Sequence, residues 1–132
     1  MKTIIFIMIS FMSFGQLEVK ETTNSSETLW SNIARQSVTV FHGDEGDFYA
    51  FYYQNAKYTH ITSIEYISFS NKEELLQFLD LAQKSIEERK DFATDSYRLT
   101  KGMGKKSCTV WGNVGYTYIT LKTISKIRES IN

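Results

Sequence analysis

The residues best suited to acid–base or metal chemistry in this 132-residue chain are its two histidines, His42 and His60. Three carboxylates, Asp44, Glu45 and Asp47, closely follow the first histidine. Two histidines and one carboxylate can hold a catalytic metal, so a small exported hydrolase or metal-dependent enzyme is one interpretation. The chain has no H-E-x-x-H spacing, however, which makes solvated histidines at strand ends the better reading. We therefore expect no metal site.

Nucleophilic catalysis is also poorly supported. Cys108 is the only cysteine, so no disulfide can form within the chain. It lies in the alternating stretch KSCTVW, which favours burial as a small hydrophobic residue over a reactive or intermolecular role. No serine stands in a G-x-S-x-G elbow. Carboxylate pairs such as Glu73–Glu74 fall in a helical pattern, where adjacent side chains point in different directions. These features favour a protein that is not an enzyme.

The segment 99–122, LTKGMGKKSCTVWGNVGYTYITLK, is rich in glycine and lysine. A phosphate-binding loop requires G-x-x-x-x-G-K-[ST], in which the glycines admit the phosphates and the hydroxyl binds magnesium. Aligned on Gly104–Lys105, the chain has Leu99 in place of the first glycine and Lys106 in place of the hydroxyl residue. The dinucleotide pattern G-x-G-x-x-G also fails at Ser107. We therefore expect turns here, and no cofactor.

A two-residue type II′ turn at Gly112–Asn113 fits the alternating residues on both sides of it. It would pair Trp111 with Val114 and Thr109 with Tyr116. Successive residues of a strand point to opposite faces, so this pairing sorts the side chains into two sets. One face carries Trp111, Val114, Tyr116 and Tyr118, and the other carries Cys108, Val110 and Ile119.

Charge is unevenly distributed although the formal net charge is zero. Acidic residues outnumber basic ones by seven over residues 16–95, and basic residues outnumber acidic ones by six over residues 96–132. Such asymmetry can create a basic face that attracts anionic partners. The alternative, which we favour, is that both halves interleave in one sheet and neutralise each other. If a basic face forms, the binding residues are Trp111, Tyr116 and Tyr118, which stack on the ligand, with Arg98, Lys101, Lys105 and Lys106 at its anionic groups.

The first fifteen residues have the pattern of a signal peptide. Lys2 precedes a twelve-residue apolar run, 3–14, and Ser13 and Gly15 fit a cleavage site before Gln16. The run is shorter than the about 20 residues that span a bilayer, and no cysteine follows the cut to carry a lipid. We expect export to a periplasm or to the outside of the cell, with no stable membrane anchor, which argues against a nucleic-acid partner.

The rest of the chain reads as a flexible leader, 16–27, followed by one domain, 28–132. The leader has two aliphatic residues and no aromatic ones, too little apolar surface to offset the entropy of ordering it. Leu29, Trp30 and Ile33 then begin the folded part, either as a helical turn or as an irregular edge.

Strands and helices alternate beyond residue 36. Two strands flank a turn at 43–46, and a third, 58–69, alternates apolar and polar residues. A capping box at Ser70 starts a helix over 71–90, and three further strands precede a short C-terminal helix. We expect an α+β fold with one antiparallel sheet of about five to six strands, in the order β-β-β-α-β-β-β-α, and the long helix on one face. The long helix buries Leu75, Phe78, Leu79, Ala82 and Ile86, and the short one Leu121, Ile124, Ile127 and Ile131.

Consecutive aromatic residues in the second strand cannot all face one core. Either Tyr49, Phe51 and Tyr53, or Phe48 and Tyr52, lie on the face away from the helix, unless the leader or the C-terminal helix covers it. Exposed aromatic patches are common at binding surfaces. The sequence therefore favours a non-catalytic binding module with a protein or glycan partner.

Overall fold

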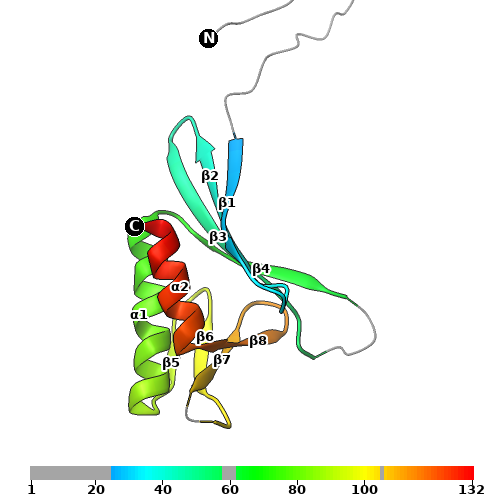
Figure 1. The fold of residues 1–132 in the computed structure, drawn as a ribbon, viewed down its shortest axis with the longest axis vertical. Helices are drawn as coiled ribbons and strands as arrows, with labels where there is room; N and C mark the ends of the chain where they lie inside the picture. Colours follow the sequence, from blue (N-terminus) through cyan, green and yellow to red (C-terminus); the bar gives the residue numbers. More distant parts are fainter. Residues whose placement is uncertain (1–24, 58–61, 105) are drawn as a thin grey trace, which may run out of the picture.

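The structure, a computed structural model, describes residues 25–57, 62–104 and 106–132, which form two four-stranded antiparallel sheets and two helices (Figure 1). The α+β class and the antiparallel pairing are confirmed. The prediction of a single sheet with five to six strands is wrong, because the strands on either side of the long helix form separate sheets. The predicted signal peptide lies outside the described residues.

Sheet A is built from the first half of the chain. Its strands are β1 (Ser25–Ser31), β2 (Ser37–Gly43), β3 (Gly46–Gln54) and β4 (Ile64–Phe69), and they are hydrogen-bonded in chain order. The tight hairpin between β2 and β3 is confirmed, with Gly43 paired to Gly46. Gly46 has a φ of 124°, which favours glycine.

Strand β1 was not predicted from the sequence. Its first three residues were expected in the flexible leader, but they pair with β2. The register shifts between Thr28 and Trp30, so Leu29 is an extra residue and the alternation that marks a strand is broken there. Trp30 then packs partly buried against the core, while Ile33 lies fully exposed in the turn before β2.

Sheet B is built from the second half. Its strands are β5 (Phe92–Ala93), β6 (Arg98–Lys101), β7 (Ser107–Trp111) and β8 (Tyr116–Thr120), again in chain order. The two halves of the chain therefore do not interleave in one sheet, contrary to our expectation. The acid-rich segment still meets the base-rich one, because α1 packs against β6, β7 and α2 and β5 pairs with β6. One ion pair that joins the two segments is Arg128 to Asp80, with an N–O distance of 2.8 Å.

The predicted register of the β7–β8 hairpin is wrong by two residues. Trp111 pairs with Tyr116, and the connection is the four-residue loop 112–115. Gly115 has a φ of 71°, and a Cβ atom there would overlap the Asn55 side chain. A contact with the end of β3 thus shapes the loop. Because the side-chain period in a strand is two, a two-residue shift leaves the predicted faces unchanged.

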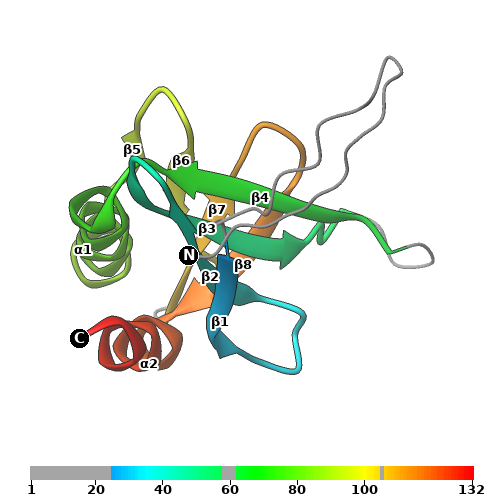
Figure 2. The same cartoon turned by 90° about the horizontal axis from the view of Figure 1, so that it is seen from above.

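Both helices match the sequence closely. Helix α1 (Lys72–Glu88) is capped by Asn71, one residue after the predicted cap Ser70: the Asn71 side chain accepts a hydrogen bond from Glu74 N at 2.9 Å. Helix α2 (Leu121–Ile131) lies beside α1 in both views (Figures 1 and 2). The apolar stripe predicted for α1 is buried, as are three of the four residues predicted for α2: Leu75, Phe78, Leu79, Ala82, Ile86, Ile124, Ile127 and Ile131.

One hydrophobic core is shared by the two sheets and the helices. Two buried amide side chains also link the sheets by hydrogen bonds. Asn55, 1% exposed, accepts a hydrogen bond from Tyr116 N on the outer edge of β8. Gln36, 4% exposed, donates to the Tyr118 carbonyl at 2.6 Å and to the Thr117 hydroxyl at 2.9 Å. Edge strands leave such groups unpaired, so these side chains take the place of another strand.

Candidate binding surfaces

The outward face of sheet B carries a row of stacked side chains. Arg98, Trp111 and Tyr116 are cross-strand neighbours on β6, β7 and β8. The Arg98 guanidinium carbon lies 4.8 Å from the centre of the Trp111 ring, and that ring lies 4.8 Å from Tyr116. Tyr118 meets Tyr116 edge-on at 5.8 Å. We call these four residues the Arg–Trp–Tyr row. The predicted grouping of the three aromatic residues with Arg98 is thus present.

A hydrogen bond to the neighbouring strand holds the row in place. Trp111 Nε1 donates a 3.0 Å hydrogen bond to the Thr100 hydroxyl of the adjacent strand, which fixes the plane of the indole. Tyr118 remains 49% exposed. Its pKa is raised, first by partial desolvation and then by the neighbouring Tyr116. The Tyr118 phenol therefore keeps its proton, and its ability to donate a hydrogen bond, above its ordinary range.

A cavity of about 640 Å³ opens beside the row. It is lined by residues 93–98, around the β5–β6 turn, by Trp111 and Tyr116, by Gly112, Asn113 and Gly115 of the loop, and by Lys57. The Thr94 hydroxyl accepts hydrogen bonds from the backbone of Ser96 and Tyr97 at 3.2 Å, so the turn has a fixed shape. The cavity thus combines a wall held by hydrogen bonds with the cationic side chains of Lys57 and Arg98 and the carboxylate of Asp95.

The predicted lysines are not part of this group. Lys101 pairs with Cys108 at the other end of the β6–β7 hairpin, on the opposite strand face from Arg98. Lys106 precedes β7 at that same end, and Lys105 lies outside the described residues. Arg98 is therefore the only one of the four predicted basic residues that the described structure places against the aromatic rings.

A second surface lies on the outward face of sheet A, and the sequence predicted only some of its residues. Of the two alternatives left open, Phe48 and Tyr52 point outward, whereas Phe51 and Tyr53 are fully buried. Phe48 stacks on Phe41 at 4.9 Å, and Tyr52 packs on Tyr66 at 5.7 Å. Phe41 and Tyr66 follow from alternation once the strand pairing is known, but nothing in the sequence alone fixes that pairing.

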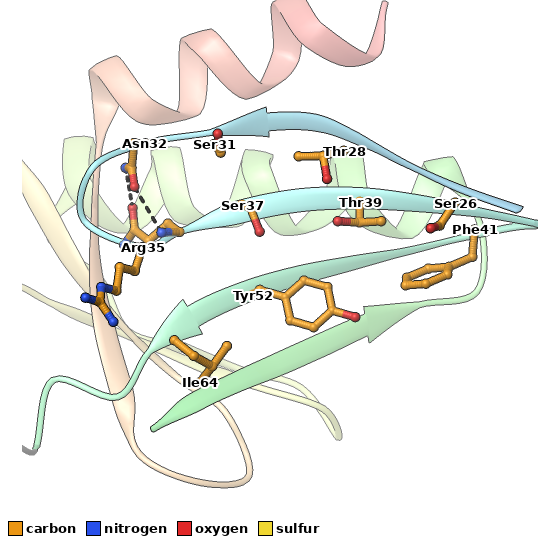
Figure 3. Close-up of a pocket in the computed structure, with 11 residues that line it drawn as sticks. Ser26, Thr28, Ser31, Asn32, Arg35, Ser37, Thr39, Phe41, Tyr52 and Ile64 are labelled. Atoms are coloured by element: carbon orange, nitrogen blue, oxygen red, sulfur yellow. Dashed lines mark hydrogen bonds between the residues drawn. The ribbon is translucent and has the colours of Figure 1, made fainter. Parts of the chain in front are cut away.

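The two aromatic pairs flank a row of small side chains, formed by Thr39, Ala50 and Ser68 on adjacent strands. A cavity of about 520 Å³ continues from this row across β1 and β2 (Figure 3). We call this surface the hydroxyl–aromatic trough. The trough comprises this cavity together with the two aromatic pairs and the row of small side chains. The cavity itself is lined by Ser26, Thr28, Ser31, Asn32, Arg35, Gln36, Ser37, Thr39, Phe41, Tyr52 and Ile64.

The histidine hypothesis finds little support among residues 25–57, 62–104 and 106–132. His42 Nδ1 lies 2.9 Å from the Asp47 carboxylate, and both side chains are nearly half exposed. His60 lies outside the described residues, and no group of three possible metal ligands occurs within them. Cys108 is buried as predicted, and burial raises the pKa of its thiol to about 12.

Comparisons with protein-family models, with curated proteins and with solved structures gave no match. Within the described part of the chain, neither helix combines the length and apolar character that crossing a bilayer requires. The features of the molecule that bear on its function are therefore the Arg–Trp–Tyr row and the hydroxyl–aromatic trough.

Proposed function

We propose that the protein is an exported, non-catalytic binding module that holds an anionic protein or glycan partner on the outward face of sheet B. The observation that supports this is the Arg–Trp–Tyr row. Trp, Tyr and Arg are the residues that most often dominate binding energy at interfaces. Here they stand in contact with one another, beside a cavity, on a face that no described helix covers.

The row is suited to binding because it is already ordered. Arg98 rests on the Trp111 ring, and the indole is held by Thr100. A side chain that is fixed before binding loses less conformational entropy on binding. The planar guanidinium can then offer paired donors to a carboxylate, sulfate or phosphate group.

Export rests on the amino-terminal pattern of Lys2, the apolar run 3–14, and the small residues Ser13 and Gly15. Expression in a host with a secretory pathway, followed by amino-terminal sequencing of the exported protein, tests it. We expect the mature chain to begin at Gln16. A chain that stays inside the cell and begins at Met1 contradicts this part of the proposal.

Binding is tested on an array of peptides and glycans that carry carboxylate, sulfate or phosphate groups. We expect capture that weakens as the salt concentration rises, because exposed charges are screened over about 10 Å at 0.1 M salt. Trp111→Ala should weaken capture about tenfold or more, and Arg98→Gln should reduce both the affinity and its salt dependence. Gln77→Ala, exposed on α1 and outside both surfaces, is the control and should leave capture unchanged.

The same array can contradict the proposal. If Trp111→Ala folds, as judged by its thermal melting curve, and captures anionic probes as well as the wild type does, the row is not the binding surface. Within the described residues no observation supports the alternative, a hydrolase that uses His42 and His60.

A further inference from the structure

The hydroxyl–aromatic trough on sheet A has a chemistry of its own. Phe48 and Tyr52 lie four residues apart on β3, about 13 Å, and each belongs to an aromatic pair. Between the pairs the sheet is low, because Thr39, Ala50 and Ser68 are small. The trough is therefore bounded by two ring walls and floored by small side chains.

No charged side chain points outward from the four strands of sheet A. The pairing places the following residues on that face: Ser26, Thr28, Ser31, Ser37, Thr39, Phe41, Phe48, Ala50, Tyr52, Gln54, Ile64, Tyr66 and Ser68. Arg35 approaches one end of the trough, where its guanidinium donates to the Thr62 hydroxyl at 3.2 Å. A charged ligand would thus lose its hydration here without meeting an opposite charge on the sheet, which is costly.

Hydroxyl groups line the side of the trough formed by β1 and β2. Those of Ser26, Thr28, Ser37 and Thr39 have no hydrogen-bond partner within the described part of the chain. A purely apolar partner would bury them unpaired, at a cost of about 1–3 kcal/mol for each. The surface therefore requires an occupant that combines an apolar face with many uncharged hydrogen-bonding groups.

We propose that this trough binds a segment of a neutral polysaccharide. A sugar ring presents a face of C–H groups and a rim of hydroxyls, each of which can donate and accept. The C–H face would lie against the ring walls, and the rim would pair with the hydroxyls of β1 and β2. Neither the sugar nor the outward face of the four strands carries a charge, and Arg35, the one cation that approaches the trough within the described part of the chain, lies at its end. The site is separate from the Arg–Trp–Tyr row, so it stands whether or not sheet B binds an anion.

A second copy of this chain fits the trough less well. Interfaces between identical subunits are more apolar than ordinary protein surfaces, whereas six of the thirteen outward residues of this sheet are serine or threonine. Packing two such faces together would crowd the aromatic pairs and leave hydroxyls without partners. A glycan supplies those partners from a thin, solvated chain.

The test is native affinity electrophoresis of the full mature protein in gels that contain one soluble polysaccharide each. The neutral probes are dextran, laminarin, galactomannan and xyloglucan, and the acidic probes are alginate and polygalacturonate. We expect at least one neutral probe to retard the protein, with an affinity that does not change with salt. Tyr66→Ala should weaken retardation about tenfold, whereas Gln77→Ala, an exposed residue of α1 outside both surfaces, should leave it unchanged.

Thr39→Val provides a second variant that keeps the shape of the side chain. It removes one hydroxyl from the floor of the trough, and we expect about fivefold weaker binding with an unchanged melting temperature. The proposal is overturned if no neutral probe retards the protein, or if only the acidic probes do. It is equally overturned if sedimentation shows a dimer that Tyr66→Ala converts to monomers, because a second copy then occupies the trough.

Discussion

The two sheets have the same strand order and share the same pair of helices, yet their outward faces differ. Sheet A presents rings and hydroxyls without charge, spread over a wide trough. Sheet B concentrates one arginine and three aromatic rings in a single stacked row. Strand pairing therefore decides which side chains gather on a face, whereas the residue types decide what that face can bind.

The inward faces differ as well. On sheet A, Phe51 and Phe69 pack against Phe78 of α1 at 5.5 and 5.3 Å. On sheet B the buried inward positions of β6, β7 and β8 carry no aromatic ring, and Phe92 of β5 packs only partly buried against the core. Because the core is continuous across both sheets, the two outward faces are held at one fixed orientation. Substitutions at the junction between the sheets should therefore cause the largest losses in the free energy of unfolding.

The largest effect is expected for Gly115→Ala. A Cβ atom at this position would overlap the Asn55 side chain, and the φ of 71° adds strain for any residue other than glycine. We expect a loss of about 3 kcal/mol in the free energy of unfolding, since strain and overlap add. Urea unfolding measures it.

Gly104→Ala is the control for that substitution. It lies in a loop of sheet B where no atom would lie within 4 Å of the added Cβ. A change below about 0.5 kcal/mol is expected for such a surface position. Equal losses for the two variants would mean that the contact between loop 112–115 and β3 does not support the fold.

Gln36→Ala comes next in size. Asn32 fixes the turn that places Gln36, because its side-chain oxygen accepts from the Gln36 backbone at 3.0 Å. Removing the Gln36 amide leaves the Tyr118 carbonyl and the Thr117 hydroxyl without their partner, at a cost of about 2 kcal/mol. Hydrogen exchange should show faster exchange of the β8 amides, with those of β2 and β3 less affected. Gln77→Ala, exposed on α1, is the control and should change neither quantity.

Most of the local structure could be predicted from the sequence, for a different reason in each element. The stripe of α1 is unambiguous because five apolar residues recur at helical spacing from Leu75 to Ile86. The faces of β7 and β8 were correct although their register was not, since an even shift preserves alternation. The division into two sheets could not be predicted, because the alternation of residues within a strand does not determine which other strand pairs with it.

The candidate surfaces show the same limit. Trp111, Tyr116 and Tyr118 were grouped from alternation alone, and the structure brings them together. Lys101 and Lys106 were added to that group because they are near in sequence, but the hairpin places them at its far end. The trough depends on strand pairs between β2, β3 and β4, which only the tertiary structure supplies.

The interior of sheet B should also give the protein a pH dependence. Burial raises the pKa of Cys108 from its ordinary 9.0 to about 12, so the unfolded chain loses this proton at lower pH than the folded one. The stability that this thiol contributes is complete below about pH 9 and is lost as pH rises from 9 towards 12. The expected slope is about 1.4 kcal/mol per pH unit.

Urea unfolding at about pH 8 and about pH 10, compared between the wild type and Cys108→Ala, isolates this contribution, because tyrosines and lysines titrate in both. The wild type should lose about 1 kcal/mol more than the variant over that interval. Identical slopes for the two proteins would show that the thiol titrates in the folded state as it does in water, and hence that the interior of sheet B admits solvent.

The smallest effect is expected for the two matched tyrosines on the outward faces. Tyr66 is 60% exposed and touches Tyr52, and Tyr118 is 49% exposed and touches Tyr116. Each loses one aromatic contact when changed to alanine, so each substitution should cost about 0.5–1 kcal/mol in the free energy of unfolding. The two losses should add in the double variant, because the side chains share no partner. A loss well above 2 kcal/mol for Tyr66→Ala alone would mean that the ring is buried in the folded protein, by another part of the chain or by a second copy. The trough would then be filled before any sugar could reach it, and only sheet B would remain as a binding surface.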